Sequence, residues 1–267
     1  MSAPRGGGSL EARVEGIGDR ALEVVDRVGR FAQLAGATFR AARRPRFPWR
    51  ETLRQLEAIG VRSTTIVLIT ALFTGMVMAL QTGFALERFG AKLYVGSVVA
   101  LSLARELGPV LTALMVGGRV GAGISAEIGA MQVTEQVDAI RALGADPIQK
   151  LVLPRVLAAT LALPLLTMLA NLLGVIGGML IATSQFHITP SFYIDTITWA
   201  VTVQDVLSGI AKTFVFGWII AMVACFVALE TTGGTVGVGR ATTAAVVVAS
   251  IAVLVSDFFL TKLMVAL

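Results

Sequence analysis

The sequence predicts an all-α polytopic membrane protein with an N-terminal interfacial helix and five transmembrane helices. Of its 267 residues, 55% are hydrophobic and only 15% are charged, and the mean hydropathy of +0.81 is rarely reached by a soluble protein of this length. The apolar residues form blocks of about 20, the length that a helix needs to cross the hydrocarbon core. Because the blocks lack the period-two alternation of a membrane barrel, we expect helical spans.

The N-terminal part, residues 10–62, is expected to be cytoplasmic and to lie along the membrane surface. Residues 1–9 contain Gly, Ser and Pro and are predicted to be disordered. From Leu10 to Ala42 the apolar residues share one helical face, which is typical of an interfacial helix; a soluble helix packed on a partner is the alternative. Arginines between positions 40 and 50 alternate with Pro, Phe and Trp. A nucleic-acid patch has similar composition, but beside a span this cluster predicts contact with anionic headgroups.

Five apolar segments follow within residues 63–267. They run approximately from Ser63 to Leu80, Tyr94 to Val116, Val156 to Ala182, Val206 to Leu229 and Ala241 to Leu263. Lys and Arg concentrate in the N-terminal part, in the connection after the second segment, which includes Arg119, and in the turn before the fifth. This distribution predicts that all three lie on the cytoplasmic side. The polar connection Thr183–Gln204 and the C-terminus are then expected on the outer side.

The polar segment Glu127–Arg155 interrupts the apolar part of the chain and contains several helix signals. We expect a short amphipathic helix over about 134–144, a sharp stop, and a second helix that enters the membrane. Thr134 is predicted to be the N-cap of the first helix, and Gly144 its left-handed end. Asp146 is predicted to cap the second helix, whose first position is a proline. An ordinary solvated loop is the alternative interpretation.

The sequence offers no catalytic, nucleotide-binding or metal-binding motif. The glycine-rich stretches Gly118–Ser125 and Gly234–Arg240 resemble phosphate loops in spacing, but both lack the lysine that reaches the phosphates. A single cysteine, Cys225, and a single histidine, His187, exclude an intrachain disulfide and a zinc site. We therefore expect no enzyme activity, metal or cofactor. Two G-x-x-x-G pairs predict close helix packing instead: Gly117 with Gly121, and Gly174 with Gly178.

Charged residues inside the predicted spans are candidate functional groups. Arg105 and Glu106 fall near the middle of the second span, where a charge costs about 2.5–3.5 kcal/mol on insertion scales. They are either a polar element beside a translocation path or a structural pair between helices. Pro109 frees a backbone carbonyl that could help to satisfy Arg105. Asp257 is expected to pair with Arg105 or with the nearby Lys262. In the fourth span, Lys212 is expected to extend outward.

Three stretches together resemble one protein family: Ala100–Arg155, Gly237–Thr243 and the region around Asp257. They are similar to the MlaE (YrbE) family, the permease subunits of ABC transporters that move lipids between bacterial membranes. The resemblance extends roughly from Pro48 to Leu267 and leaves the charged N-terminal extension unexplained. It implies an N-terminal interfacial elbow helix, five transmembrane helices and a homodimer in the bacterial inner membrane. It also implies two cytoplasmic ATPase subunits, a periplasmic MCE-domain protein and often a small STAS-domain protein as partners, and no nucleic acid.

The resemblance further implies two sets of site residues. The short helix at about 134–144 would be the coupling helix that docks into the ATPase, through Glu135, Asp138 and Arg141. Lipid would bind between the two protomers, near spans one, two and five. By position, the candidate lipid-binding residues are Met78, Gln81, Leu86, Phe89, Arg105 and Glu106.

The sequence therefore predicts the permease subunit of a transporter that moves phospholipids between the inner and outer membranes and maintains outer-membrane lipid asymmetry. ATP hydrolysis is expected on a separate subunit. Three alternatives stay open. The first is a permease for sterols or other hydrophobic compounds in an MCE-type importer. The second is a secondary transporter in which Glu106 and Asp257 relay protons. The third is a scaffold that only anchors an MCE protein.

Overall fold

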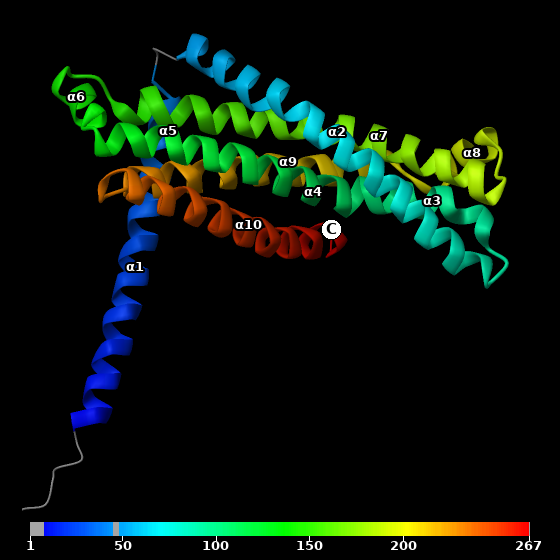
Figure 1. Cartoon of the computed structure of the whole chain (residues 1–267), viewed down its shortest axis with the longest axis horizontal. Coiled ribbons are helices and arrows are strands. Elements are labelled where there is room, and N and C mark those ends of the chain that lie inside the picture. The colour runs from blue at the N-terminus through cyan, green and yellow to red at the C-terminus, as the bar shows by residue number, and fades with distance from the viewer. Residues whose placement is uncertain (1–7, 45–47, 267) are drawn as a thin grey trace, which may run out of the picture. The chain divides into compact units, whose positions relative to one another are not determined.

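The computed structural model describes residues 8–44 and 48–266, and the chain divides into two compact units, residues 1–46 and 47–267. All regular secondary structure within the described residues is helical, which confirms the predicted fold class (Figure 1).

The first unit contains one helix, α1 (Gly8–Ala42), whose 35 residues give a length of about 52 Å. Apolar side chains such as Leu22 and Val28 are exposed along it, as expected for an amphipathic helix; its place at the membrane surface stays a prediction. The helix begins inside the segment predicted to be disordered, of which residues 1–7 lie outside the described residues. Residues 45–47 of the basic cluster also lie outside them.

The second unit contains five helices that are long and apolar enough to cross a membrane, which confirms the predicted number of spans. They are α2 (Trp49–Glu87), a composite helix Lys92–Val133, a composite helix Ile148–Phe186, α9 (Val203–Leu229) and α10 (Gly234–Ala266). The first composite helix consists of η1 (Lys92–Tyr94), α3 (Val95–Ser102), the π-helical turn η2 (Leu103–Leu107), α4 (Gly108–Val116), the π-helical turn η3 (Gly117–Gly121) and α5 (Ala122–Val133). The second composite helix consists of η4 (Ile148–Val152) and α7 (Leu153–Phe186). Two shorter helices, α6 (Gln136–Ala142) and α8 (Pro190–Ala200), lie in the connections.

These helices are longer than the predicted spans. The 42 residues of Lys92–Val133 extend for about 63 Å, whereas the hydrocarbon core is only about 30 Å thick. The prediction that Arg119 lies in a loop after Val116 is therefore wrong, because the helix continues through both. Similarly, α2 begins at Trp49, well before the predicted start of the first span. Hydropathy marks only the apolar middle of a helix, and its polar ends can remain helical in water.

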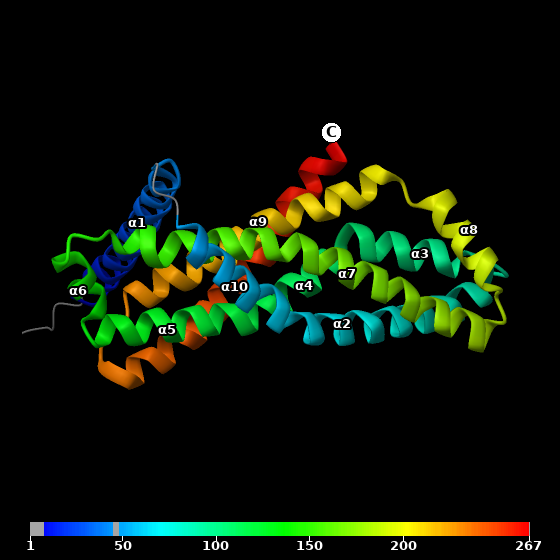
Figure 2. The ribbon, with the colours of Figure 1, turned by 90° about the horizontal axis from the view of Figure 1, so that it is seen from above.

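Glycines allow α2 and α7 to lie side by side with their backbones in contact (Figures 1 and 2). A Cβ atom at Gly75 would come 1.8 Å from the Gly174 carbonyl oxygen, and one at Gly177 would come 2.3 Å from that of Leu72. The predicted packing role of Gly174 is thus confirmed. The other predicted pair packs more loosely, because a Cβ at Gly117 would lie 3.3 Å from the Ile220 side chain.

The connection Thr183–Gln204, predicted only as a polar segment, contains the helix α8, which packs against α3 (Figure 2). Tyr193 of α8 is fully buried, and its hydroxyl donates to the Val175 carbonyl at 3.3 Å. Burial raises the pKa of the Tyr193 phenol from 10.0 to about 12. The phenol therefore stays neutral and fixes α8 to the composite helices.

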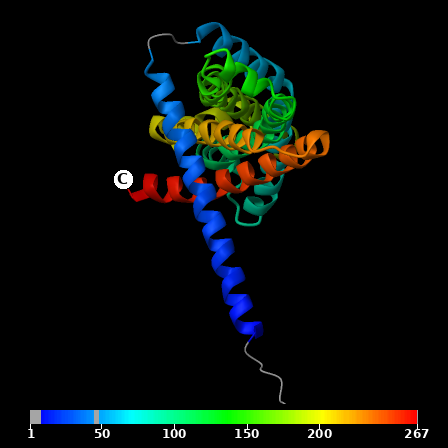
Figure 3. The ribbon, with the colours of Figure 1, turned by 90° about the vertical axis from the view of Figure 1, so that its left-hand side faces the viewer.

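The five long helices differ in how much of their surface the bundle covers. The end view shows α9 among its neighbours, whereas α10 lies at one edge (Figure 3). Along α10 only a narrow stripe of Ala241, Ala245, Ala249 and Val253 is buried. Large apolar side chains, including Ile251 at 57% exposure, face outward over the rest of α10. This apolar surface is suited to lipid or to another apolar protein surface.

Candidate functional site

Charged side chains from three of the long helices converge in the second unit. The group consists of Arg105 and Glu106 of η2, Asp205 and Lys212 of α9, and Asp257 of α10, which together we call the ionic cluster. A polar pocket of about 780 Å³ opens beside it. Four members of the ionic cluster line this pocket with Thr202, Gln204, Ser208, Thr261 and Met264.

One half of the ionic cluster is an ion pair between Arg105 and Asp205. The Arg105 Nε and Nη2 atoms lie 2.6 and 2.5 Å from Asp205 Oδ1. The second oxygen, Oδ2, accepts from the backbone N–H and the hydroxyl of Thr202, each at 2.8 Å. This capping box begins α9 and leaves the Asp205 side chain only 7% exposed. A single carboxylate therefore both starts a helix and positions the guanidinium.

The other half is centred on Lys212, whose side chain is 2% exposed. Its Nζ lies 2.7 Å from Glu106 Oε2 and 3.2 Å from Asp257 Oδ1, and it donates to the Thr261 hydroxyl at 2.7 Å. A buried ammonium is stable only with such a set of acceptors. Lys212 thus connects η2, α9 and α10 at one point.

The local backbone supplies Lys212 with one more acceptor. Pro109 has no N–H, so the Arg105 carbonyl lacks its usual helical donor, and Lys212 Nζ donates to that carbonyl at 3.2 Å. The predicted release of a carbonyl by Pro109 is therefore correct, but this carbonyl satisfies Lys212 and not the Arg105 side chain. The π-helical turn η2 ends at Leu107, two residues before Pro109, and such turns are frequent at functional sites.

Two predictions about these charges are wrong. Asp257 pairs with Lys212, and not with Arg105 or Lys262. Lys212 does not extend outward, because carboxylates from two other helices enclose it. Sequence reasoning also missed Asp205, although the Thr202-x-x-Asp205 spacing is a recognisable capping signal. Arg105 and Glu106 pair with residues about a hundred positions away in the chain, so no local sequence pattern indicates these ion pairs.

The ionic cluster provides donors and acceptors within an apolar bundle, but no nucleophile beside a general base. Within the described parts of the chain, no group of three or more His, Cys, Asp or Glu side chains could hold a metal ion. The cluster contains three carboxylates and two cations, and the Arg105 and Glu106 side chains remain 52% and 40% exposed. It can therefore hold helices together and also present charge of both signs to a polar ligand.

The six candidate lipid-binding residues do not form one group. Arg105 and Glu106 line the pocket of the ionic cluster, whereas Met78 and Leu86 pack against a core of Ala79, Val95, Val99 and Leu103. Gln81 is exposed on α2, and Phe89, just beyond the end of α2, is 83% exposed.

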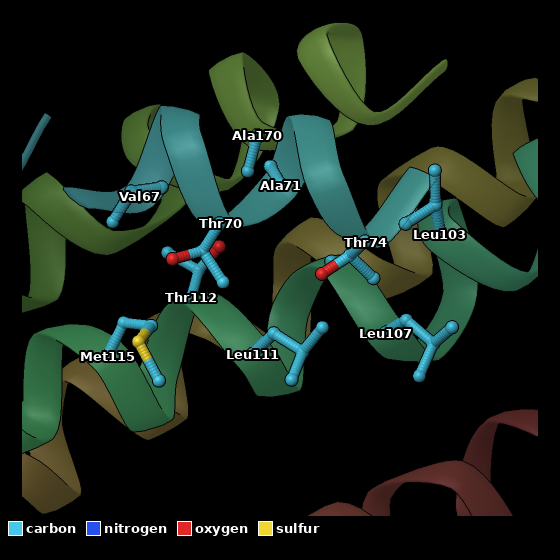
Figure 4. Close-up of a pocket in the computed structure, with 11 residues that line it drawn as sticks. Val67, Thr70, Ala71, Thr74, Leu103, Leu107, Leu111, Thr112, Met115 and Ala170 are labelled. Carbon is cyan, nitrogen blue, oxygen red and sulfur yellow. The ribbon is translucent and has the colours of Figure 1, made fainter. Parts of the chain in front are cut away.

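A separate, narrow apolar cleft lies between α2, α4 and α7 (Figure 4). Leu107, Leu111 and Met115 form one wall, and Thr70 and Thr74 of α2 lie opposite. The Thr70 hydroxyl donates to the Ile66 carbonyl of its own helix at 2.7 Å, which leaves mainly its methyl group for packing. None of the six candidates lines this cleft, and its surface suits hydrocarbon.

The central connection contains the short helix α6, as predicted, but its first residues differ from the prediction. The Thr134 hydroxyl donates to the Ala130 carbonyl at 2.8 Å, so Thr134 belongs to the end of α5. Glu135 is the N-cap of α6, with a left-handed φ of 60°. Thr134 is therefore not the N-cap, because its side chain bonds back into the preceding turn and cannot accept from α6.

The end of α6 agrees with the prediction. Gly144 has a φ of 75°; its N–H donates to the Arg141 carbonyl at 2.9 Å, and the Ala145 N–H donates to the Ile140 carbonyl at 3.1 Å. This is a Schellman motif. The Asp146 carboxylate then accepts from the Ile148 N–H at 2.9 Å, as expected for a capping residue. Both ends of the connection are thus fixed by hydrogen bonds.

The three predicted coupling residues lie together on the exposed surface of α6. Glu135, Asp138 and Arg141 are all exposed, and Arg141 Nη1 lies 2.7 Å from Asp138 Oδ1. Val137 is fully buried and anchors the helix, whereas Leu143 just beyond it is 86% exposed. This surface has the polar and apolar groups that a protein interface uses.

Known proteins match this chain over most of its length. The family model described as Permease MlaE matches residues 52–263. A probable ABC transporter permease protein of Rickettsia felis is 42% identical over 247 residues, which cover 92% of this chain and 95% of that protein. The chloroplastic protein TRIGALACTOSYLDIACYLGLYCEROL 1 of Arabidopsis thaliana is 41% identical over 214 residues, covering 80% and 61%.

A relative with a more specific name is the intermembrane phospholipid transport system permease protein MlaE of Haemophilus influenzae. It is 37% identical over 216 residues, which cover 79% of this chain and 82% of that protein. These matches confirm the resemblance drawn from the central segment, and they agree with the five long apolar helices. The chain therefore belongs to the MlaE permease family, as a multi-pass membrane protein related to ABC transporter permeases.

Proposed function

We propose that this chain is the membrane subunit of an ATP-driven transporter that moves phospholipids between the inner and outer membranes, in the service of outer-membrane lipid asymmetry. The observation that carries the proposal is the exposed helix α6, which is fixed at both ends between two long helices. A rigid helix in this position can transmit the movement of an attached ATPase. The name of the Haemophilus influenzae relative supports phospholipid as the transported class.

The proposed ATPase contact is the exposed surface of α6. Glu135, Asp138 and Arg141 provide charges for docking, and Leu143 provides an apolar contact. ATP hydrolysis is assigned to a separate cytoplasmic subunit. In this proposal, the N-terminus, α6 and the turn before α10 lie in the cytoplasm, and the C-terminus lies in the periplasm.

The proposed lipid path lies between two copies of this chain. The exposed apolar surface of α10, including Ile251, Leu254 and Phe258, supports a homodimer with lipid between the protomers. Arg105 and Glu106 would contact the polar part of the lipid. On the periplasmic side an MCE-domain protein would receive or deliver lipid, and a STAS-domain protein is a further candidate partner. Light scattering of the purified protein in detergent tests the dimer, and a monomeric mass would contradict it.

The function is tested by ATP-driven lipid transfer in vesicles that contain the chain and its ATPase. We expect the double variant E135A/D138A to lose most transfer while the ATPase subunits still hydrolyse ATP, because the movement no longer reaches the membrane subunit. The matched control is E87A, since Glu87 is an exposed acid at the opposite end of α2 from Trp49. Full transfer by E135A/D138A would contradict the docking surface.

The ionic cluster favours one alternative strongly enough to be tested in the same vesicles. Glu106 and Asp257 share the single ammonium of Lys212, an arrangement that a proton carrier also uses. A pH gradient imposed without the ATPase should move no lipid if the proposed function is correct. Lipid movement driven by that gradient would identify a secondary transporter.

A further inference from the structure

A second polar pocket, of about 590 Å³, lies between α2 and the η3–α5 part of the long composite helix. It belongs to the half of the bundle that ends at α6 (Figure 1). Its polar lining includes Gln55, Arg62 and Arg119, and its other walls include Ile59, Gly123 and Ile124. We call this pocket the arginine notch. It shares no lining residue with the ionic cluster or with the apolar cleft.

The arginine notch carries positive charge that the described residues do not neutralise. Arg62 and Arg119 are both exposed, and no carboxylate in the described ranges forms an ion pair with either. Arg119 Nη1 donates to the hydroxyl of the buried Ser63 at 2.7 Å, which orients a guanidinium that has further N–H donors. The one acid in the lining, Glu127, already pairs with the buried Arg155 at 2.7 Å.

The shape of the arginine notch leaves room for a ligand. A Cβ atom at Gly123 would meet nothing within 4 Å, so this part of the lining is open. Ile59 and Ile124 are 3% and 5% exposed and form an apolar floor. A pocket with two guanidinium groups above apolar side chains fits an anionic group that is attached to hydrocarbon.

The surface next to the arginine notch is suited to that hydrocarbon. On α2, Ile66, Ile69 and Phe73 follow Arg62 at helical spacing and lie on the same face. Their exposures are 42%, 54% and 58%. An acyl chain placed along this stripe would have its phosphate at Arg62 and Arg119. Free phosphate would use the same guanidinium groups but would gain nothing from the stripe.

We propose that the arginine notch binds the phosphate headgroup of an anionic phospholipid from the leaflet on the α6 side, with an acyl chain along Ile66, Ile69 and Phe73. The lipid connects α2 to η3 and α5, and the Arg119–Ser63 hydrogen bond also joins α2 to η3. This site is independent of the proposed transport function, because a permease that moves another substrate would still hold this lipid.

The test measures phosphatidylglycerol bound to the purified full-length chain by native mass spectrometry in detergent. We expect R62Q to weaken binding by about tenfold, because one charge-assisted hydrogen bond is lost. G123L should also weaken binding by filling the open part of the pocket without changing any charge. R54Q is the matched control, because Arg54 is an exposed arginine of the same helix outside the notch, and it should bind as the wild type does.

A second arm separates lipid from free anion. A large excess of inorganic phosphate should leave phosphatidylglycerol bound, because phosphate lacks the acyl chain. Displacement at comparable concentrations would identify a site for free anions and overturn the proposal. Equal losses of binding in R62Q and R54Q would show general charge attraction and would overturn the proposal. Unchanged binding in both R62Q and G123L would show that the arginine notch is not the site and would also overturn the proposal. ATP-driven transfer by these variants is a separate measurement, so failure of the lipid site leaves the proposed function standing.

Discussion

Lys212 shows how single residues organise this bundle. Its ammonium group pairs with carboxylates from η2 and α10. It also donates to the Arg105 carbonyl, which Pro109 leaves without its helical donor. Each of these groups alone would be costly to bury. Together they fix the positions of three helices at one point.

The first prediction concerns the loss of this ammonium. The variant K212M should destabilise the folded protein by about 1–3 kcal/mol, because the carboxylates of Glu106 and Asp257, which are 40% and 19% exposed, lose their buried partner. Additional replacement of both acids, in K212M/E106Q/D257N, should recover much of the loss. The measurement is the unfolding midpoint in detergent, with K262M as control, since Lys262 is exposed on α10. Equal midpoints for K212M and K262M would show that the cluster does not stabilise the fold.

The second prediction concerns pH. Because burial raises the pKa of the Tyr193 phenol to about 12 from its ordinary 10.0, the unfolded chain releases this proton at lower pH than the folded chain does. The contribution of Tyr193 to stability is therefore complete below pH 10 and is lost as the pH rises from 10 toward 12.

This titration can be observed directly. The chain has two tyrosines, so in the variant Y94F the tyrosinate absorbance reports Tyr193 alone. We expect a midpoint near pH 12 in the folded protein and near pH 10 in denaturant. A midpoint near 10 in the folded protein would mean that α8 does not bury this side chain.

Residue-level contacts were also the least predictable part of the site. Arg105, Glu106 and Asp257 could be selected from the sequence, because charges within apolar segments are conspicuous. Their partners could not, because Asp205 and Lys212 meet them only after distant helices pack. A lone lysine in an apolar run has the same local pattern whether it extends to the headgroups or lies in the core, and tertiary contacts decide between the two.

At the scale of elements, most boundaries follow from local chemistry. The number of spans, the stop at Gly144 and the cap at Asp146 could be predicted from apolar length, a left-handed glycine and an Asp–Pro pair. The continuation of the second helix through Arg119 could not, because hydropathy does not distinguish a polar helix from a loop. The helix α8 was missed for a similar reason, since its fixed position depends on burial of Tyr193 against other helices.

The close contact of α2 with α7 gives the third prediction. G75A should destabilise the protein by about 1–3 kcal/mol, because the added Cβ would lie 1.8 Å from the Gly174 carbonyl oxygen. G118A is the matched control, because a Cβ at Gly118 meets nothing within 4 Å. Chemical unfolding in detergent compares the two. If G75A is as stable as G118A, the two backbones are not in contact.

At the scale of the whole molecule, this member of the MlaE permease family leaves two surfaces exposed, one on α6 and one on α10. In the proposed function, the exposed surface of α6 contacts the ATPase and the exposed apolar surface of α10 contacts a second copy of the chain. The ionic cluster lies within the second unit, where helices attached to both surfaces meet. A displacement of α6 would reach the cluster through α5, η3 and α4, which form one continuous helix with η2.

The most direct test of this account is phospholipid transfer from vesicles that contain the chain, its ATPase subunits and an acceptor MCE protein. We expect labelled phospholipid to move only when ATP and the ATPase are both present, and we expect E135A/D138A to lose most of this movement. Transfer at the same rate without ATP or without the ATPase would contradict the central claim that this chain moves lipid with energy received through α6.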